Sequence, residues 1–329
     1  MKKIAFFTLI FILITLSGFS YSVALMITGE IGGNPIYEMM RDGAVKAANE
    51  ENIDLKIVEG GYNNSKWEQS LIALAATGKY DLVITFTEGM PASVNKASRM
   101  FPNQKFALID GAAGLYDNVF SLSFKDEEMT YIAGYFAALV TLSDMKNANN
   151  AKRIGLIAGD IYPAMTEKML PGFKNGAKSV DDDIDVDFSV AGSWGDPNKG
   201  RELAAALFDN DVDIVLSISG GTGVGIIQAA AEKGKYFIGV DSNIISYSPE
   251  TILACTLKKA DEAIYNVIKR ASKGDLPFGT VERWGIMEGV ISFTFNDENY
   301  IRNVPEFIRE KMLDLYNSFL EGEIEAIKQ

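Results

Sequence analysis

Short β-rich runs and amphipathic helical runs alternate along the chain from Val23 onward, a pattern typical of parallel sheets with helices on both faces. One series of strands is predicted at Val23–Thr28, Leu55–Glu59, Asp81–Phe86, Phe106–Asp110 and Val119–Phe124, with helices that begin near Pro35, Ser65 and Pro91. A second series is predicted at Arg153–Ala158, Val186–Val190, Ile214–Ile218 and Tyr236–Val240, with helices at Met165–Val180, Pro197–Asp209 and Thr222–Lys233. Two successive series favour two doubly wound α/β lobes over one enlarged sheet.

The C-terminal part of the chain is predicted to return to both lobes. We assign the strand Ile252–Leu257 and the helix Asp261–Lys273 to the first lobe, and Gly289–Phe295 and the helix Pro305–Ile327 to the second. The first lobe then comprises residues 23–124 plus 250–280, and the second comprises residues 125–249 plus 281–329. Three strands would cross between the lobes and form a hinge.

The first residues have the organisation of a secretory signal. Two lysines precede the apolar run Ile4–Leu16, and the small residue Ser22 ends the segment. The run is shorter than the roughly 20 apolar residues that span a bilayer. We therefore expect residues 1–22 to be cleaved, which leaves a soluble protein in the periplasm or outside the cell. The only cysteine, Cys255, lies far from this segment, so no lipid anchor is expected.

Composition excludes several classes of function. The chain has 31 basic and 44 acidic residues, and its net charge of −13 disfavours a nucleic-acid partner. With no histidine and one cysteine, it has no Ser-His-Asp triad, no imidazole metal ligand and no internal disulfide. No spacing of acids indicates a glycosidase-like pair. Any catalysis would therefore depend on carboxylates, lysines or tyrosines alone, and we expect neither a metal nor a cofactor.

Polar side chains follow the predicted strands at the edge where ligands of open α/β sheets bind. Asp110 and Asp241 each come directly after a strand, and a charge-assisted hydrogen bond from a ligand hydroxyl or ring N–H to such an acid contributes roughly 1.5–3 kcal/mol. Asn34 and Asp196 each precede a proline, so we expect them to cap helices with free N–H groups at the same edge.

A glycine-rich loop, Ser219–Gly225, leads from a strand into a helix. It has neither the Gly-Lys-Ser/Thr of a P-loop nor the spacing of a dinucleotide fold. We interpret it as a tight turn that brings Gly221 and Thr222 close to a ligand. Aromatic residues near the strand ends are Tyr37, Tyr62, Trp67, Tyr162 and Trp194. Trp67 is expected in the core, whereas Trp194 lies between a strand and a helix cap and is expected to stack on a planar ligand.

Five segments carry a family resemblance: Tyr131–Leu139, Gly172–Ala177, Ala191–Gly200, Gly220–Gly223 and Ile238–Ser242. In this order they resemble the basic membrane protein family of substrate-binding lipoproteins, which includes purine nucleoside receptors. The resemblance implies the type I periplasmic-binding fold, closure about a hinge and no catalysis. It also implies a monomer that delivers its ligand to an ABC permease in the inner membrane. A sensor that docks on a membrane signalling protein is the alternative.

The resemblance also assigns roles to single residues. Trp194 corresponds to a stacking aromatic, the two strand-end acids to ligand acceptors, and Gly221 to a glycine that the ligand approaches closely. Lys258 corresponds to a lysine that holds polar groups of the ligand, and it is expected on the lobe opposite Trp194. The second stacking position falls near Leu216, which is not aromatic.

Two segments resemble the riboflavin-binding branch of this family more than the nucleoside binders. They are the first loop, Ile31–Met39, and Val58–Asn63 with the following Trp67. The loop adds Asn34 and Tyr37 to the expected site, and the second segment adds Tyr62. The tricyclic ring of riboflavin fits aromatic faces, and its ribityl hydroxyls fit the acids. We therefore expect riboflavin as the transported ligand, with a purine nucleoside as the alternative.

Overall fold

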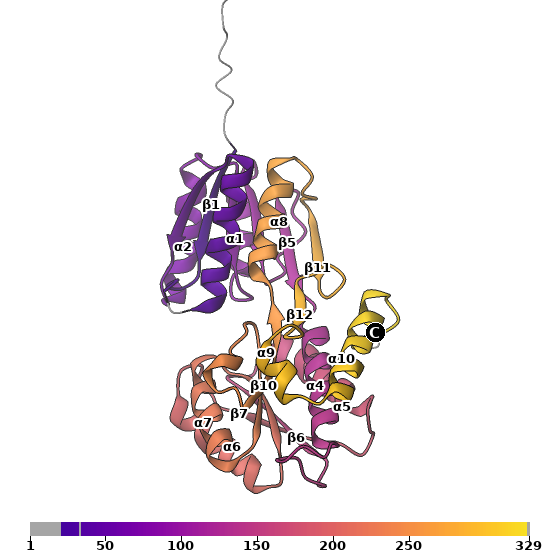
Figure 1. Ribbon diagram of the computed structural model, residues 1–329. Helices are drawn as coiled ribbons and strands as arrows, with labels where there is room; N and C mark the ends of the chain where they lie inside the picture. Colours follow the sequence, from indigo (N-terminus) through magenta and orange to yellow (C-terminus); the bar gives the residue numbers. More distant parts are fainter. Residues whose placement is uncertain (1–20, 33, 328–329) are drawn as a thin grey trace, which may run out of the picture.

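The computed structural model describes residues 21–32 and 34–327 and shows two α/β lobes (Figure 1). Most of the predicted signal segment lies outside the described residues. Ser22 lies within them and begins the first strand, where its backbone N and its Oγ each donate to Asp81 Oδ2 over 2.7 Å. Cleavage before Val23 would remove these two contacts. Among the described residues, no helix has the length and apolar character needed to span a membrane.

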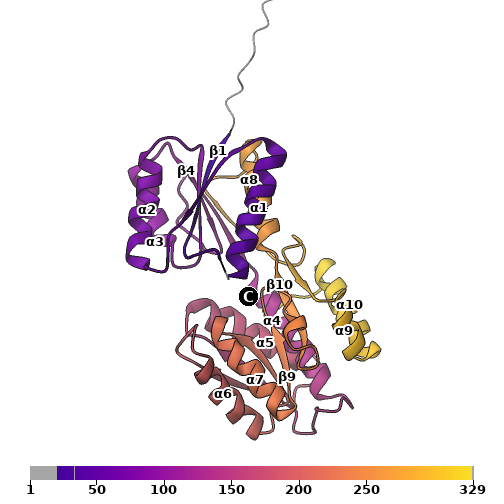
Figure 2. The same ribbon diagram turned by 60° about the vertical axis from the view of Figure 1, so that its left-hand side comes forward.

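The first lobe is built on a six-stranded sheet in the order β11-β5-β4-β3-β1-β2, in which all neighbours are parallel. Its strands are β1 (Ser22–Ile27), β2 (Asp54–Glu59), β3 (Leu82–Phe86), β4 (Lys105–Ile109), β5 (Val119–Phe124) and β11 (Thr280–Trp284). Its helices are α1 (Pro35–Glu51), α2 (Asn64–Ala76), α3 (Pro91–Met100) and α8 (Ala260–Ser272). Figure 2 shows α2 and α3 on one face of this sheet and α1 and α8 on the other.

The second lobe repeats this arrangement in the order β12-β10-β9-β8-β6-β7, with β12 antiparallel to β10. Its strands are β6 (Arg153–Ala158), β7 (Asp185–Val190), β8 (Ile214–Ile218), β9 (Tyr236–Gly239), β10 (Ile252–Lys258) and β12 (Ile291–Phe293). Its helices are α4 (Asp126–Thr141), α5 (Leu170–Lys178), α6 (Pro197–Asp209), α7 (Gly223–Lys233), α9 (Glu298–Asn303) and α10 (Glu306–Leu320). Two short 3₁₀ turns, Gly220–Thr222 and Ile245–Tyr247, complete it.

Burial explains why the strand predictions are confirmed to within one residue for every strand up to β10. The inner strands β3 and β8 are buried at all positions, so each appears in the sequence as a continuous apolar run, as strands covered on both faces do. The helix predicted at Met165–Val180 is instead a π-helical turn, Met165–Met169, followed by α5. The long C-terminal helix ends at Leu320, and the short helix α9 before it was not predicted.

The predicted lobe boundaries in the C-terminal part are wrong. The strand β10, assigned to the first lobe, pairs in parallel with β9 and continues the second sheet, because it is buried along its length and extends that sheet's apolar core. The strand β11 pairs with β5 at the edge of the first sheet, although all of it after Thr280 was assigned to the second lobe. β11 is mostly exposed, so its sequence lacks an apolar run that would have revealed it.

The chain crosses between the lobes three times, as expected. The crossings lie between β5 and α4, between β10 and α8, and between β11 and β12. Backbone hydrogen bonds connect them: Lys125 N donates to Trp284 O, and Lys259 N donates to Val290 O, each over 2.8 Å. The three connections therefore form one hydrogen-bonded hinge.

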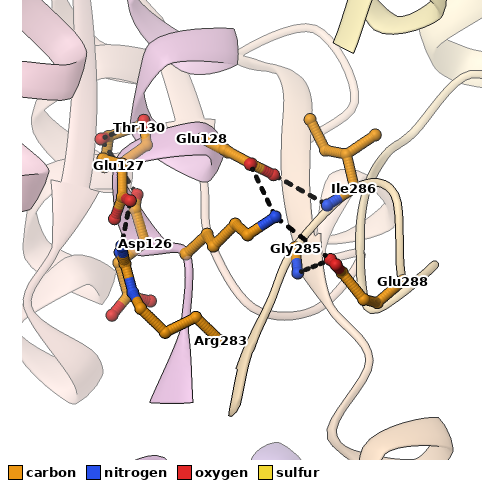
Figure 3. Close-up of polar contacts among 9 residues, drawn as sticks. Asp126, Glu127, Glu128, Thr130, Arg283, Gly285, Ile286 and Glu288 are labelled. Atoms are coloured by element: carbon orange, nitrogen blue, oxygen red, sulfur yellow. Dashed lines mark hydrogen bonds and ion pairs between the residues drawn. The ribbon is translucent and has the colours of Figure 1, made fainter. Parts of the chain in front are cut away.

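A glutamate at the start of α4 and a glutamate within the third crossing hold that crossing in place (Figure 3). Glu128 Oε2 accepts from Ile286 N over 2.8 Å, and Glu288 Oε2 accepts from Gly285 N over 2.6 Å. Lys125 Nζ lies 3.4 Å from a carboxylate oxygen of each glutamate. Burial raises the pKa of Glu128, and the Ile286 N–H and Lys125 oppose this shift. A charged network thus fixes the first crossing to the third.

We predict that Glu128→Ala lowers the free energy of unfolding by about 1–3 kcal/mol, because it leaves the Ile286 N–H without its acceptor. Urea denaturation of the ligand-free protein measures this change. Glu262→Ala is the matched control, since Glu262 forms only an exposed 3.7 Å ion pair with Lys46 and its loss should change stability by less than about 0.5 kcal/mol. Equal changes in the two variants would contradict a special role for Glu128.

Candidate functional site

A cavity of about 970 Å³ lies between the two lobes, at the carboxyl ends of the strands of both sheets. Of the nine residues predicted for the site, eight line this cavity: Asn34, Tyr37, Tyr62, Asp110, Trp194, Gly221, Asp241 and Lys258. This position agrees with the rule that open α/β sheets bind ligands beyond the carboxyl ends of their strands. Sequence positions up to 224 residues apart, from Asn34 to Lys258, therefore meet in one cavity.

The cavity has aromatic side chains on both lobes. Tyr37, Tyr62 and Trp67 form what we call the first-lobe wall, and Tyr162 and Trp194 form the second-lobe wall. The two rings of the second-lobe wall are 6.0 Å apart between centroids and are inclined by 48°. Trp67, expected in the core, packs against the core of the first lobe from a partly buried position and also lines the cavity. Its Nε1 donates to Gly61 O over 2.7 Å.

Two positions singled out in the sequence lie outside the cavity. Leu216 is fully buried in β8, and Tyr162, beyond the end of β6, provides the second ring of that lobe instead. Thr222 is also fully buried, and its hydroxyl donates to Ser193 O and accepts from Asp196 N, each over 2.9 Å. Thr222 therefore holds the loop that carries Trp194 rather than lining the cavity.

The two expected helix caps differ. Asp196 caps α6, since its Oδ1 accepts from Lys199 N over 3.1 Å. Asn34 makes no such bond to α1, and its side chain lines the cavity. The position of Asn34 is thus compatible with a role in ligand binding.

A buried lysine joins the acids of the two lobes. Lys258 is 5% exposed, and its Nζ lies 2.8 Å from Asp126 Oδ1 and 3.6 Å from Asp110 Oδ1. Its Nζ also lies 4.9 Å from the centre of the Phe124 ring. Lys258 ends β10, so it belongs to the second lobe together with Trp194, and its predicted position on the opposite lobe is wrong.

Burial and neighbouring charges control protonation in this cluster. Burial raises the pKa of Asp110 to about 6, against the opposing effect of Lys258. Burial likewise raises the pKa of Asp241. Burial alone would lower the pKa of Lys258, but Asp110, Asp126 and Asp241 hold it well above its usual value. The lysine is therefore permanently charged, and its charge is shared among three acids.

Several cavity residues were not predicted. Asp126 follows the first crossing directly and looks in the sequence like an ordinary acid at a helix start, and Glu88 looks like a loop acid. Asp160 follows a strand end, as Asp110 does, but was not assigned to the site. The sequence signal for Asp126 was its position two residues after β5, where the chain first crosses between the lobes. Lys258 ends β10, where the chain crosses for the second time. With these acids, the charged lining is five carboxylates and one lysine among the described residues.

A model of the family described as ABC transporter substrate-binding protein PnrA-like matches residues 20–321. The chain belongs to this family. It is therefore a substrate-binding protein of the ABC-transporter type and not an enzyme. The expected relationship to basic membrane proteins is confirmed, because basic membrane protein D of Borreliella burgdorferi is 30% identical over 230 residues, covering 67% of this chain and 63% of the relative.

Further relatives share the family and the fold. The ABC transporter nucleoside-binding protein BmpA of Lactococcus lactis is 26% identical over 262 residues, covering 74% of this chain and 70% of the relative. The crystal structure of an ABC transporter solute-binding protein from Aeropyrum pernix superposes with a TM-score of 0.75 at 25% identity, covering 93% of this chain and 92% of that chain. The predicted two-lobe periplasmic-binding fold is thus confirmed for this family member.

Asp110 should make the stability of the ligand-free protein depend on pH. Its pKa rises from 3.8 to about 6 on folding, so the folded state binds more protons in this window and stability falls as pH rises through it. We predict that Asp110→Asn removes this fall and raises the unfolding free energy at pH 7 by on the order of 1–3 kcal/mol relative to the native chain.

Urea denaturation at pH values from 4 to 8 measures this difference. Asp314→Asn, at an exposed position of α10, is the matched control and should give a curve parallel to that of the native chain. If the Asp110→Asn curve also stays parallel to it, the carboxyl of Asp110 does not titrate in this window and the prediction is wrong.

Proposed function

We propose that this substrate-binding protein takes a nucleoside-like ligand, meaning a planar heteroaromatic ring that carries several hydroxyl groups. The observation that carries the proposal is the combination of aromatic walls on both lobes with acids between them. A planar ring gains about 0.5–1.5 kcal/mol from stacking on an aromatic side chain beyond its buried area. Hydroxyl and ring N–H groups are the donors that buried carboxylates require.

The acids also restrict the charge of the ligand. The cavity is lined by Glu88, Asp110, Asp126, Asp160 and Asp241, and of the residues that the structure describes only Lys258 opposes their charge there. Since Lys258 is already shared among three acids, it does not offer a free positive charge to a phosphate. The cavity therefore favours unphosphorylated ligands, because an added phosphate would meet several carboxylates at low dielectric.

A purine nucleoside is the first candidate, and the relative from Lactococcus lactis that is named as nucleoside-binding supports it. Riboflavin is the second candidate. It is favoured by the three rings of the first-lobe wall, since a tricyclic ring covers more aromatic surface than a bicyclic one, and by a cavity of about 970 Å³. Both ligands share the ring and the hydroxyl groups that the site requires.

The proposed mechanism is closure about the hinge. Asp110 belongs to the first lobe and Asp241 to the second, so a ligand that donates to both makes more contacts when the lobes approach. This difference in contacts shifts the population toward the closed form. The closed form would then deliver the ligand to a permease from the extracytoplasmic side.

Calorimetric titration with guanosine and with riboflavin tests the proposed ligand class. We predict binding of at least one of them, weakened about tenfold or more by Trp194→Ala, which removes a stacking surface. Tyr247→Ala is the matched control, since Tyr247 is 76% exposed and does not line the cavity. Absence of binding by both ligands at millimolar concentration would rule out the proposed class.

Phosphorylated counterparts test the charge of the cavity. We predict that guanosine monophosphate binds at least tenfold more weakly than guanosine, and flavin mononucleotide at least tenfold more weakly than riboflavin. The difference should shrink at high salt, since salt screens the repulsion. Equal affinity of a ligand and its phosphate ester would show that the carboxylates do not select by charge.

A further inference from the structure

The strands β1 and β6 take the same place in the two sheets, and each is followed within two residues by a glycine and then an acid. Each strand lies second from one edge, between β2 and β3 in the first lobe and between β7 and β8 in the second. Gly29 and Glu30 follow β1, and Gly159 and Asp160 follow β6. The two glycines thus follow corresponding strands of the two lobes, although Gly29 is the second residue after β1 and Gly159 is the first after β6.

Each glycine lies under an aromatic ring of the cavity wall. A Cβ added at Gly159 would lie 2.7 Å from both Cδ2 and Cε3 of Trp194 and 3.0 Å from its Cζ3. The six-membered ring of that indole thus packs against the glycine backbone. A Cβ added at Gly29 would overlap the ring of Tyr37 and lie 3.1 Å from Tyr62 Cε1.

The need for glycine at these positions is spatial and not conformational. Neither Gly29 nor Gly159 has a positive φ, so an alanine could adopt either backbone conformation. An alanine at either position would displace the ring, because a Cβ does not approach other heavy atoms this closely. The backbone lies on one side of each ring, so a displaced ring would move toward the cavity.

We propose that Gly29 and Gly159 are positioning residues for ligand binding. They set how far the aromatic walls lie from the middle of the cavity, and hence the width of the slot that a planar ring can enter. This inference rests on the proposed function, because it assumes that the slot holds a planar ligand. The glycines themselves would not contact the ligand. They would act only through Tyr37, Tyr62 and Trp194.

Alanine substitution tests the inference, and the chain offers a matched control beside each site. Gly159→Ala is compared with Gly195→Ala, and Gly29→Ala with Gly32→Ala, because a Cβ at Gly32 or Gly195 meets nothing within 4 Å and neither residue has a positive φ. We expect at least tenfold weaker binding of guanosine or riboflavin in the first variant of each pair and less than a twofold change in its control. Melting temperatures exclude unfolding as the cause.

A double-mutant cycle shows whether Gly159 acts through the indole. If it does, Gly159→Ala has no further effect on affinity once Trp194→Ala has removed the ring. Full additivity of the two losses would overturn the inference, since it would mean that the added methyl group blocks the ligand directly or disturbs another part of the cavity.

A readout without ligand separates this inference from the proposed function. The chain has three tryptophans, so 5-fluorotryptophan labelling gives three ¹⁹F resonances, and the one from Trp194 is identified by its loss in Trp194→Phe. We expect Gly159→Ala to move this resonance several times further than Gly195→Ala does. An unmoved resonance overturns the inference even if ligands bind. A large shift in a protein that binds neither ligand supports the positioning of the ring and rejects only the ligand class.

Discussion

The ammonium group of Lys258 lies where the polypeptide crosses between the lobes, and it is surrounded by acids that come from different parts of the fold. Asp110 follows a strand of the first sheet, Asp126 follows the first crossing, and Asp241 lies beyond a strand of the second sheet. Removal of the lysine would leave three carboxylates close together and largely out of water, which costs more than the loss of any one ion pair. The arrangement of these three acids at the cavity therefore depends on this one buried charge.

The rest of the site repeats similar groups from the two lobes around these acids. Equivalent strands of the two lobes place equivalent groups at the cavity: β4 and β9 are followed by Asp110 and Asp241, both with φ near +60°. An acid in this left-handed conformation turns the chain sharply at the strand end, which is unusual for a residue with a side chain. The repetition explains why a ligand can be held by similar chemistry from both sides.

Sequence patterns predicted the strands and helices that depend on interactions between residues near one another in the chain. The strands β6 and β8 and the helix α6 were predicted residue for residue, because apolar runs and a proline-started helix are visible in the sequence. The edge strand β11 and its lobe were missed, since an exposed strand has no apolar run to distinguish it. Trp67 was assigned to the core because helical periodicity does not show which end of α2 faces a cavity. Lys258, Asp110 and Asp241 could be proposed for the site, but Asp126 and the contacts between the lysine and these acids required the fold.

The aromatic rings and the acids of the cavity would contribute to ligand binding in different ways. The second-lobe wall belongs to one lobe, so a ligand that only stacks on Trp194 would gain affinity without favouring closure. Donors that reach both Asp110 and Asp241 favour closure, because those acids approach each other only when the lobes do. Burial raises the pKa of both acids, so a ligand donor that bonds to them compensates for hydration that burial reduces. A planar ring alone would use only the aromatic walls, and a polyol alone would use only the acids. A molecule that combines a planar ring with hydroxyl groups would therefore both stack on the walls and favour closure.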